Sequence, residues 1–227
     1  MLRRCQGNNN TGWRRSRPLQ VVFLSVYLVT GAFSNSAVLS YSHDIAGREP
    51  LPDLIFRLVG EQEWAVWAGE NFVTICFLCL TLLLLLHRHR LTICRRLVFI
   101  AGTLYLMRCV TLLGTQLPPG YSNNTLRCRP RTNFSWTFLD RWVEQVVHLG
   151  RITSSHGMLC GDMLFSGHTL IMMLCCLTIG HYLPKKYQLL VIFPYLGAFC
   201  GMGCLIISRT HYTVDVVIAF WLTNLVF

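Results

Sequence analysis

The sequence predicts an all-α, polytopic membrane protein with six transmembrane helices. Three observations predict this class: 53% of the 227 residues are hydrophobic, only 13% are charged, and the apolar residues gather in long runs. A typical soluble domain carries about 25% charged residues, and a disordered chain combines low hydrophobicity with high net charge. The composition therefore excludes both classes and favours a chain that lipid surrounds.

A helix needs about 20 apolar residues to cross a bilayer, and six runs approach that length. The first follows three arginines as a signal peptide would, but its apolar stretch is too long for one and predicts an uncleaved signal-anchor. The second ends in five consecutive leucines, and the last stops at Phe227 with no polar flank, which indicates a truncated sequence. In chain order the expected spans are Leu19–Leu39, Ala65–Leu86, Leu97–Leu117, Leu159–Leu183, Leu189–Ile207 and Tyr212–Phe227.

The formal net charge is +10, from 20 Lys and Arg against 10 Asp and Glu. The basic residues flank the apolar runs, so we expect them to face lipid headgroups and not nucleic acid. Residues 1–18, the His87–Arg96 loop and the turn at Lys185 and Lys186 hold 11 of the 20 basic residues and none of the acids. Since short loops rich in Lys and Arg stay cytoplasmic, we expect a cytoplasmic N-terminus, although the second outer loop, with five arginines, weakens this prediction.

The 11 cysteines do not predict a metal site or a dense disulfide framework. Most lie within the apolar runs, where Cys behaves as a small hydrophobic residue. Cys76 and Cys79 have the spacing of a zinc ligand pair, but no second pair of Cys or His matches them. Cys128 and Cys160 would pair only if their side of the membrane is oxidising, and we expect them to stay unpaired.

Five ionisable residues in or next to the expected spans are the functional candidates, because such groups are costly inside a membrane. They are Arg108, Asp162, His168, His211 and Asp215. His211 and Asp215 are four residues apart, so on a helix the carboxylate could fix the tautomer of the imidazole and raise its basicity. A buried His–Asp pair with a purely structural role is the alternative for this pair taken alone.

The expected depths of these groups favour a shared site. At about 1.5 Å per residue, His168 and Arg108 each lie at most roughly 13 Å below the outer ends of their spans, and His211 begins the sixth span. Two histidines, a carboxylate and an arginine at one level fit phosphoryl transfer, in which one His attacks phosphorus and the other protonates the leaving oxygen. Arg108 would offer its fork of donors to the phosphate oxygens. No carboxylate cluster for magnesium is present, so we expect neither metal nor other cofactor.

Four stretches of the chain resemble the motifs of the sphingomyelin synthase family. Cys160–Thr169 (CGDMLFSGHT) resembles its C-G-D-x-x-x-S-G-H-T motif, and the segment from His211 (HYTVDV) resembles its H-Y-T-x-D-V motif. Pro50–Asp53 matches P-L-P-D, and Arg108–Thr111 is similar to R-x-x-T. Phe165 stands where the related lipid phosphate phosphatases have proline, which favours the synthase branch.

This resemblance implies a fold and an activity. The family, part of the lipid phosphate phosphatase superfamily, transfers phosphocholine from phosphatidylcholine to ceramide at the lumenal face of the Golgi or the cell exterior. By resemblance His211 is the nucleophile, Asp215 its partner and His168 the acid and base, while we assign Arg108, Asp162 and Ser166 to substrate binding. Residues 1–18 would be a cytoplasmic segment and residues 19–227 the catalytic domain.

Alternatives remain open at the level of sequence. A ceramide phosphoethanolamine synthase would use phosphatidylethanolamine with the same chemistry, and a lipid phosphatase would use water as the acceptor. A non-catalytic membrane scaffold or ceramide-binding protein is a further alternative, and a homo-oligomer is compatible with the sequence. Aromatic residues of the second outer loop, such as Trp142, are candidates for a choline cage, but an interfacial aromatic belt explains them equally well.

Overall fold

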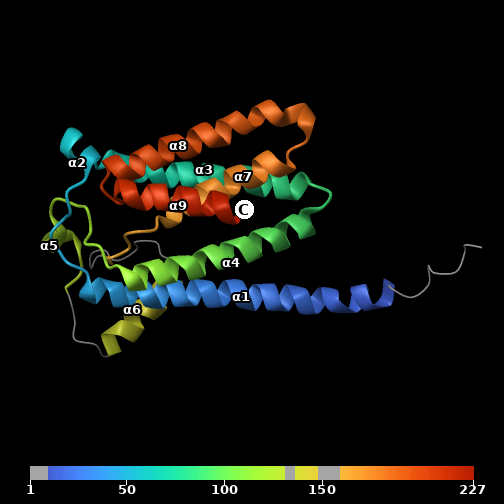
Figure 1. Cartoon of the computed structure of the whole chain (residues 1–227), viewed down its shortest axis with the longest axis horizontal. Coiled ribbons are helices and arrows are strands. Elements are labelled where there is room, and N and C mark those ends of the chain that lie inside the picture. The colour runs from blue at the N-terminus through green and yellow to red at the C-terminus, as the bar shows by residue number, and fades with distance from the viewer. Residues whose placement is uncertain (1–9, 131–135, 148–158) are drawn as a thin grey trace, which may run out of the picture.

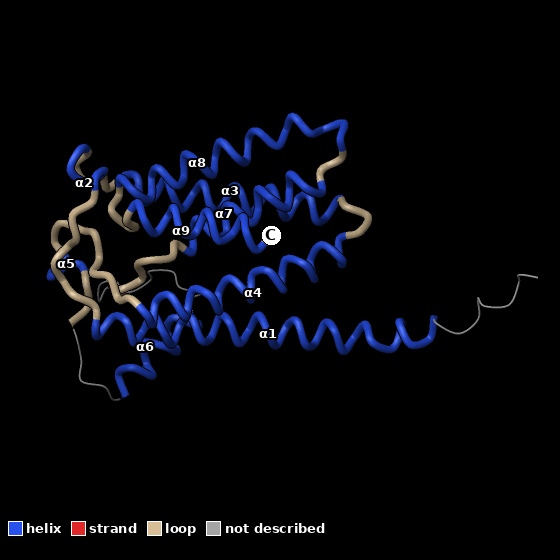
Figure 2. Tube along the Cα trace, in the orientation of Figure 1, coloured by secondary structure: helices blue, strands red, loops and turns tan. Residues whose placement is uncertain are grey.

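The computed structural model describes residues 10–130, 136–147 and 159–227, and the regular elements of these residues are all helices (Figures 1 and 2). The predicted all-α class is therefore confirmed for the described part of the chain. In order the elements are α1 (Asn10–Ile45), α2 (Leu54–Leu58), α3 (Trp64–Leu86), α4 (Arg90–Gly114), α5 (Asn124–Arg127), α6 (Trp136–Val147), α7 (Gly167–Tyr182), the 3-10 helix η1 (Lys185–Val191), α8 (Ile192–Ile207) and α9 (Thr213–Val226).

Four of these helical segments are long and apolar enough to cross a membrane, judged by length and composition. They are Leu19–Ile45, Trp64–Leu86, Arg90–Gly114 and Lys185–Ile207. The two other expected spans correspond to the shorter apolar helices α7 and α9. Large apolar side chains stand exposed along the long helices, for example Leu82 of α3 and Phe193 of α8, as expected where lipid and not water is the neighbour.

The six apolar helices α1, α3, α4, α7, α8 and α9 divide into a pair and a group of four. α1 packs along α4, whereas α3, α7, α8 and α9 pack mainly on one another (Figure 1). The pair meets closely at Gly102, where an added Cβ would lie 2.7 Å from the ring of Tyr27. Small residues allow such close helix approach in membranes. α4 also contacts α3, α7 and α9 and so joins the pair to the group.

The fourth expected span is corrected by the structure. Helix α7 begins at Gly167, and residues 159–166 form a non-helical segment instead of the start of a helix over Leu159–Leu183. Two residues in this segment have a positive φ, Gly161 (121°) and Leu164 (88°), which is incompatible with an α-helix. Ser166 then caps α7, because its side chain accepts the N–H of Thr169.

Short elements gather at one end of the bundle, which we name the outer end. α2 and α5 lie there together with α6, a helix that the apolar runs did not predict (Figures 1 and 2). α6 packs against α1, where the indole of Trp142 donates to the carbonyl of Phe33. The residues at which α4 ends and α9 begins lie at this same end, so the outer end is where the candidate site residues meet.

Candidate active site

Two imidazoles from different segments converge at the outer end. His168 is the second residue of α7, and His211 lies two residues before α9. Their ring centroids are 6.0 Å apart, with the rings edge to face. The expected convergence of the two histidines is present, but it arises from loops and helix starts. His168 does not lie nine residues down a helix, as the depth argument assumed.

The Asp215 carboxylate joins the segments that carry both histidines. It is fully buried; one oxygen accepts the N–H of Tyr212 (2.9 Å) and the other accepts the N–H of Leu164 (2.7 Å). The Nδ1 atom of His211 lies 3.6 Å from the nearer Asp215 oxygen and has no hydrogen-bond partner within the described residues. Because α9 starts at Thr213, this His–Asp approach depends on the capping turn before the helix and not on one helix face.

Arg108 reaches the site from α4 and is almost completely buried. Its guanidinium donates to the carbonyl of Phe165 (2.8 Å), to the side-chain oxygen of Asn35 (3.0 Å) and to the carboxylate of Asp162. It therefore fixes the segment before α7 against α1 and α4. A guanidinium has five N–H donors, so two remain without an acceptor among the described residues.

The partly exposed side of the site is formed by His168 and Asp162. The Asp162 side chain keeps 33% of its surface accessible, whereas that of His211 keeps 5%. Ser166 is fully buried, and its hydroxyl is used to cap α7. Within the described residues, no three His, Cys, Asp or Glu side chains are grouped closely enough to hold a metal ion.

A carboxylate outside the predicted site set, Asp53, holds the start of α9. Its oxygens accept the backbone N–H and the hydroxyl of Thr213, both at 2.9 Å, and the N–H of Ile55. Partial burial would raise the pKa of the Asp53 carboxyl, but the hydrogen bonds from Thr213 and Ile55 hold this pKa below its usual value. The hydroxyl of Tyr212 accepts the N–H of Leu51 in addition, so the Pro50–Asp53 segment clamps the residues that follow His211.

A disulfide joins Cys128 to Cys160, and the expectation that these cysteines stay unpaired is wrong. The bond closes because the non-helical segment before α7 brings Cys160 back to the outer loops. The same segment is held from α1, where the N–H of Cys160 donates to Nδ1 of the buried His43 (2.8 Å). His43 was missed at the sequence level, because it follows the expected first span among polar neighbours (Ser40, Ser42 and Asp44).

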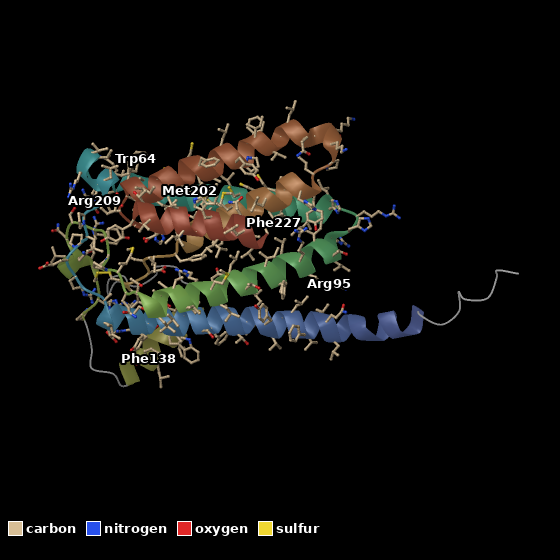
Figure 3. The ribbon with its side chains drawn as sticks, in the orientation of Figure 1. Trp64, Arg95, Phe138, Met202, Arg209 and Phe227 are labelled. Atoms are coloured by element: carbon tan, nitrogen blue, oxygen red, sulfur yellow. A yellow bond between two sulfur atoms is a disulfide. The ribbon has the colours of Figure 1, made fainter. Side chains whose placement is uncertain are left out.

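Arg209, whose role the sequence left open, fastens the outer loops. Its backbone is left-handed, with φ 58°, and its guanidinium donates to the carbonyl of Phe56 and to the hydroxyl of Ser122. The guanidinium also stacks over the Phe56 ring, 5.1 Å from the ring centre. Figure 3 shows Arg209 at the outer end of the bundle, whereas Arg95 lies toward the opposite end.

Comparison with known proteins identifies relatives of this chain. Residues 159–227 match the model of the PAP2 superfamily C-terminal domain, and this region contains both histidines, Asp162 and Asp215. A Caenorhabditis elegans protein with the provisional name phosphatidylcholine:ceramide cholinephosphotransferase 3 is 48% identical over 97% of this chain. Phosphatidylcholine:ceramide cholinephosphotransferase 2 is 35% identical over 88% of the chain in C. elegans and 36% identical over 77% in Homo sapiens.

The chain is a homologue of the phosphatidylcholine:ceramide cholinephosphotransferases. The resemblance to sphingomyelin synthases that the motifs indicated is thereby confirmed, and the C-terminal third carries the PAP2 superfamily domain. The chain spans 63%, 61% and 48% of the lengths of these three relatives, respectively.

Proposed function

We propose that this protein transfers phosphocholine from phosphatidylcholine to ceramide and releases diacylglycerol. The observation that carries the proposal is the approach of two imidazoles, with centroids 6.0 Å apart, in a homologue of cholinephosphotransferases. One of these imidazoles faces a buried carboxylate, Asp215. This arrangement supplies one group to attack phosphorus and one to carry a proton, on opposite sides of a phosphate placed between the rings.

In the first half-reaction, Nε2 of His211 attacks the phosphorus of phosphatidylcholine. The bond from phosphorus to the diacylglycerol oxygen breaks, and protonated His168 gives its proton to that oxygen. Asp215 faces Nδ1 of His211, so its charge stabilises the imidazolium character that develops as the P–N bond forms. Diacylglycerol leaves, and phosphocholine remains on His211.

In the second half-reaction, ceramide takes the place of diacylglycerol. Neutral His168 accepts the proton of the primary hydroxyl of ceramide while that oxygen attacks phosphorus and the P–N bond breaks. The products are sphingomyelin and the original protonation states of both histidines. The two unused N–H donors of Arg108 are available to the phosphate oxygens, and partly exposed Asp162 faces the approaching headgroup.

We further propose that six helices cross the membrane, as in a Golgi or plasma-membrane protein with this site facing the lumen or the exterior. α7 and α9 are shorter than a bilayer core of about 30 Å, and the non-helical residues that precede them, held by Arg108 and Asp53, would extend their path toward the outer surface. The Cys128–Cys160 disulfide supports a lumenal outer end, because disulfides persist in oxidising compartments.

The test is a transfer assay with the protein in vesicles that contain fluorescent ceramide. Phosphatidylcholine as the sole donor is expected to give fluorescent sphingomyelin, and His211→Ala is expected to reduce the rate by roughly 10⁴-fold or more while the protein remains inserted. Product only from phosphatidylethanolamine would identify a phosphoethanolamine transferase instead. Free phosphate released from phosphatidic acid, with no ceramide product, would identify a phosphatase.

A further inference from the structure

A cavity that is open on one side lies at the end of the bundle opposite the outer end, beside α1 and the start of α4, and all of its lining residues except the half-buried Arg95 are exposed. Its volume is about 500 Å³, within the range of sites that hold small ligands. Three arginines contribute to its lining, which consists of Gln20 from α1 and Arg88, His89, Arg90, Leu91, Thr92 and Arg95 from the α3–α4 turn and α4. Figure 1 shows that α4 and α1 diverge toward this end.

The positive charge of this cavity is not neutralised within the protein. Among the residues that the structure describes, no ion pair involves Arg88, Arg90 or Arg95. None of the ten acidic residues of the sequence lies in the α3–α4 turn or the first turns of α4. The start of α4 adds to the positive potential, because no side chain caps it. The cavity is therefore suited to an anion.

The position of the cavity identifies the source of that anion. Arg90 and Arg108 are 18 residues apart on α4, which corresponds to about 27 Å along the helix axis. This is close to the thickness of a bilayer core, about 30 Å, so the cavity lies at the headgroup level of the leaflet opposite the active site. Leu91 of the lining is 69% exposed, and Leu19, the residue before Gln20 on α1, is 73% exposed, so apolar surface is present on both helices beside the arginines.

We propose that this cavity binds the phosphate-bearing headgroup of an anionic phospholipid from that leaflet. The arginines would contact the phosphate oxygens, and the acyl chains would lie along the exposed apolar surface of α1 and α4. Basic pockets between membrane helices on the cytoplasmic side are suited to such headgroups. With the active site facing the lumen or the exterior, this leaflet is the cytoplasmic one. The lipid is therefore a ligand distinct from both substrates of the transfer reaction.

The experiment measures lipid binding by native mass spectrometry of the purified full chain with a phosphatidylinositol monophosphate. The variant Arg88→Gln/Arg95→Gln is expected to weaken binding by about 30-fold, since each basic residue contributes roughly a fivefold gain near an anionic surface. The matched control is Lys185→Gln/Lys186→Gln, which removes the same charge from an exposed turn outside the cavity. The control is expected to change binding less than about threefold, because this measurement presents one lipid and no charged membrane surface, and neither lysine lines the cavity.

Three outcomes would contradict the proposal. Equal losses in the two double variants would show general attraction to a basic surface, and no loss in either would place the lipid elsewhere. Equal affinity for the matching soluble inositol bisphosphate would show a soluble ligand, because a lipid ligand gains from its chains. Gln20→Glu, which adds a negative charge from the other helix, serves as an independent variant and is expected to weaken binding in the same direction.

A separate measurement keeps this proposal distinct from the transfer activity. In vesicles of phosphatidylcholine and ceramide without anionic lipid, Arg88→Gln/Arg95→Gln is expected to form product at the wild-type rate. A wild-type protein that binds the phosphoinositide but makes no product would contradict the proposed function and leave the cavity proposal standing.

Discussion

The two ends of the α1–α4 pair carry arginines in opposite circumstances. At the outer end, the guanidinium of Arg108 is buried and donates to three different partners. At the other end, Arg88 and Arg95 line a cavity and take part in no ion pair of the described chain. An arginine that donates to three protein groups holds a segment in place and keeps only its two remaining donors for a ligand, whereas an arginine without an ion-pair partner can offer its whole guanidinium to an external anion.

The largest expected effect is on catalysis at the outer end. His168→Ala is expected to lower the turnover number by about 10²–10⁴-fold, because a positioned proton donor and acceptor is removed. The measurement is sphingomyelin formation from fluorescent ceramide at saturating phosphatidylcholine. His181→Ala, at the exposed far end of the same helix α7, is the matched control. A His168→Ala enzyme that keeps most of its activity would remove this residue from the reaction.

The comparison of the arginines predicts a difference in stability. Arg108→Ala is expected to lower the free energy of unfolding by about 3–5 kcal/mol, because Asp162, Asn35 and the Phe165 carbonyl lose a buried partner. Arg88→Ala, measured in detergent without added lipid, is expected to change it by less than about 0.5 kcal/mol. Thermal unfolding of both variants measures these changes. Equal losses of stability in the two variants would contradict the proposed difference between the two ends.

The two ends also differ in covalent linkage, because the Cys128–Cys160 disulfide lies at the outer end. Cys128→Ser/Cys160→Ser is expected to lower the free energy of unfolding by about 2–4 kcal/mol, since the bond closes a loop with a sequence separation of 32. Cys79→Ser/Cys200→Ser replaces two exposed free cysteines and is the control. Reductant should destabilise the wild type and leave the variant without the disulfide unchanged; the reverse result would argue against this bond.

The smallest of these effects is expected at Asp53. Asp53→Asn should lower the free energy of unfolding by about 1.5–3 kcal/mol, the range for a hydrogen-bonded charged group, and should lower kcat more than KM, because the clamp acts through His211. Asp140→Asn, on the exposed side of α6, is the control.

The stabilisation by Asp53 is also expected to depend on pH. The pKa of Asp53 is lowered in the folded state, so its stabilisation is complete above the unfolded pKa of about 3.9 and is lost as the pH falls through the lower folded value. The difference in melting temperature between the wild type and Asp53→Asn should therefore shrink at acid pH. A difference that is constant with pH would mean that ionised Asp53 does not carry the effect.

The sequence predicted those parts of the fold that depend on local composition. The expected span Ala65–Leu86 agrees with α3 to within one residue, because a predominantly apolar run ends there at polar neighbours. The prediction of a helix that starts at Leu159 was wrong. It relied on composition, and Leu159, Met163 and Leu164 are as apolar as the residues of a membrane helix. What prevents a helix there is tertiary: a disulfide at one side and the Asp215 carboxylate on the Leu164 N–H at the other.

In the candidate site, too, some features follow from local sequence and others depend on tertiary contacts. His168 and His211 stood out as ionisable groups in apolar runs, and the structure brings them together. The roles of Asn35 and Asp53 could not be predicted in this way. Nothing in the sequence around Asn35 indicates that it binds Arg108, and nothing around Asp53 indicates that it binds Thr213. Their partners lie 73 and 160 residues away in the chain, so only the folded arrangement identifies them.

The pairing of α1 with α4 bears on how the protein is made. α1 is synthesised first, but its packing partner α4 is synthesised only after α3. Until then, the side chains of Asn35 and His43 on α1 lack the hydrogen-bond partners that they have in the folded protein. Its late docking depends on the absence of a side chain at Gly102. A bulky residue at that position is therefore expected to deplete the protein through cellular quality control before it reaches its destination, and the surviving molecules would work at an ordinary rate.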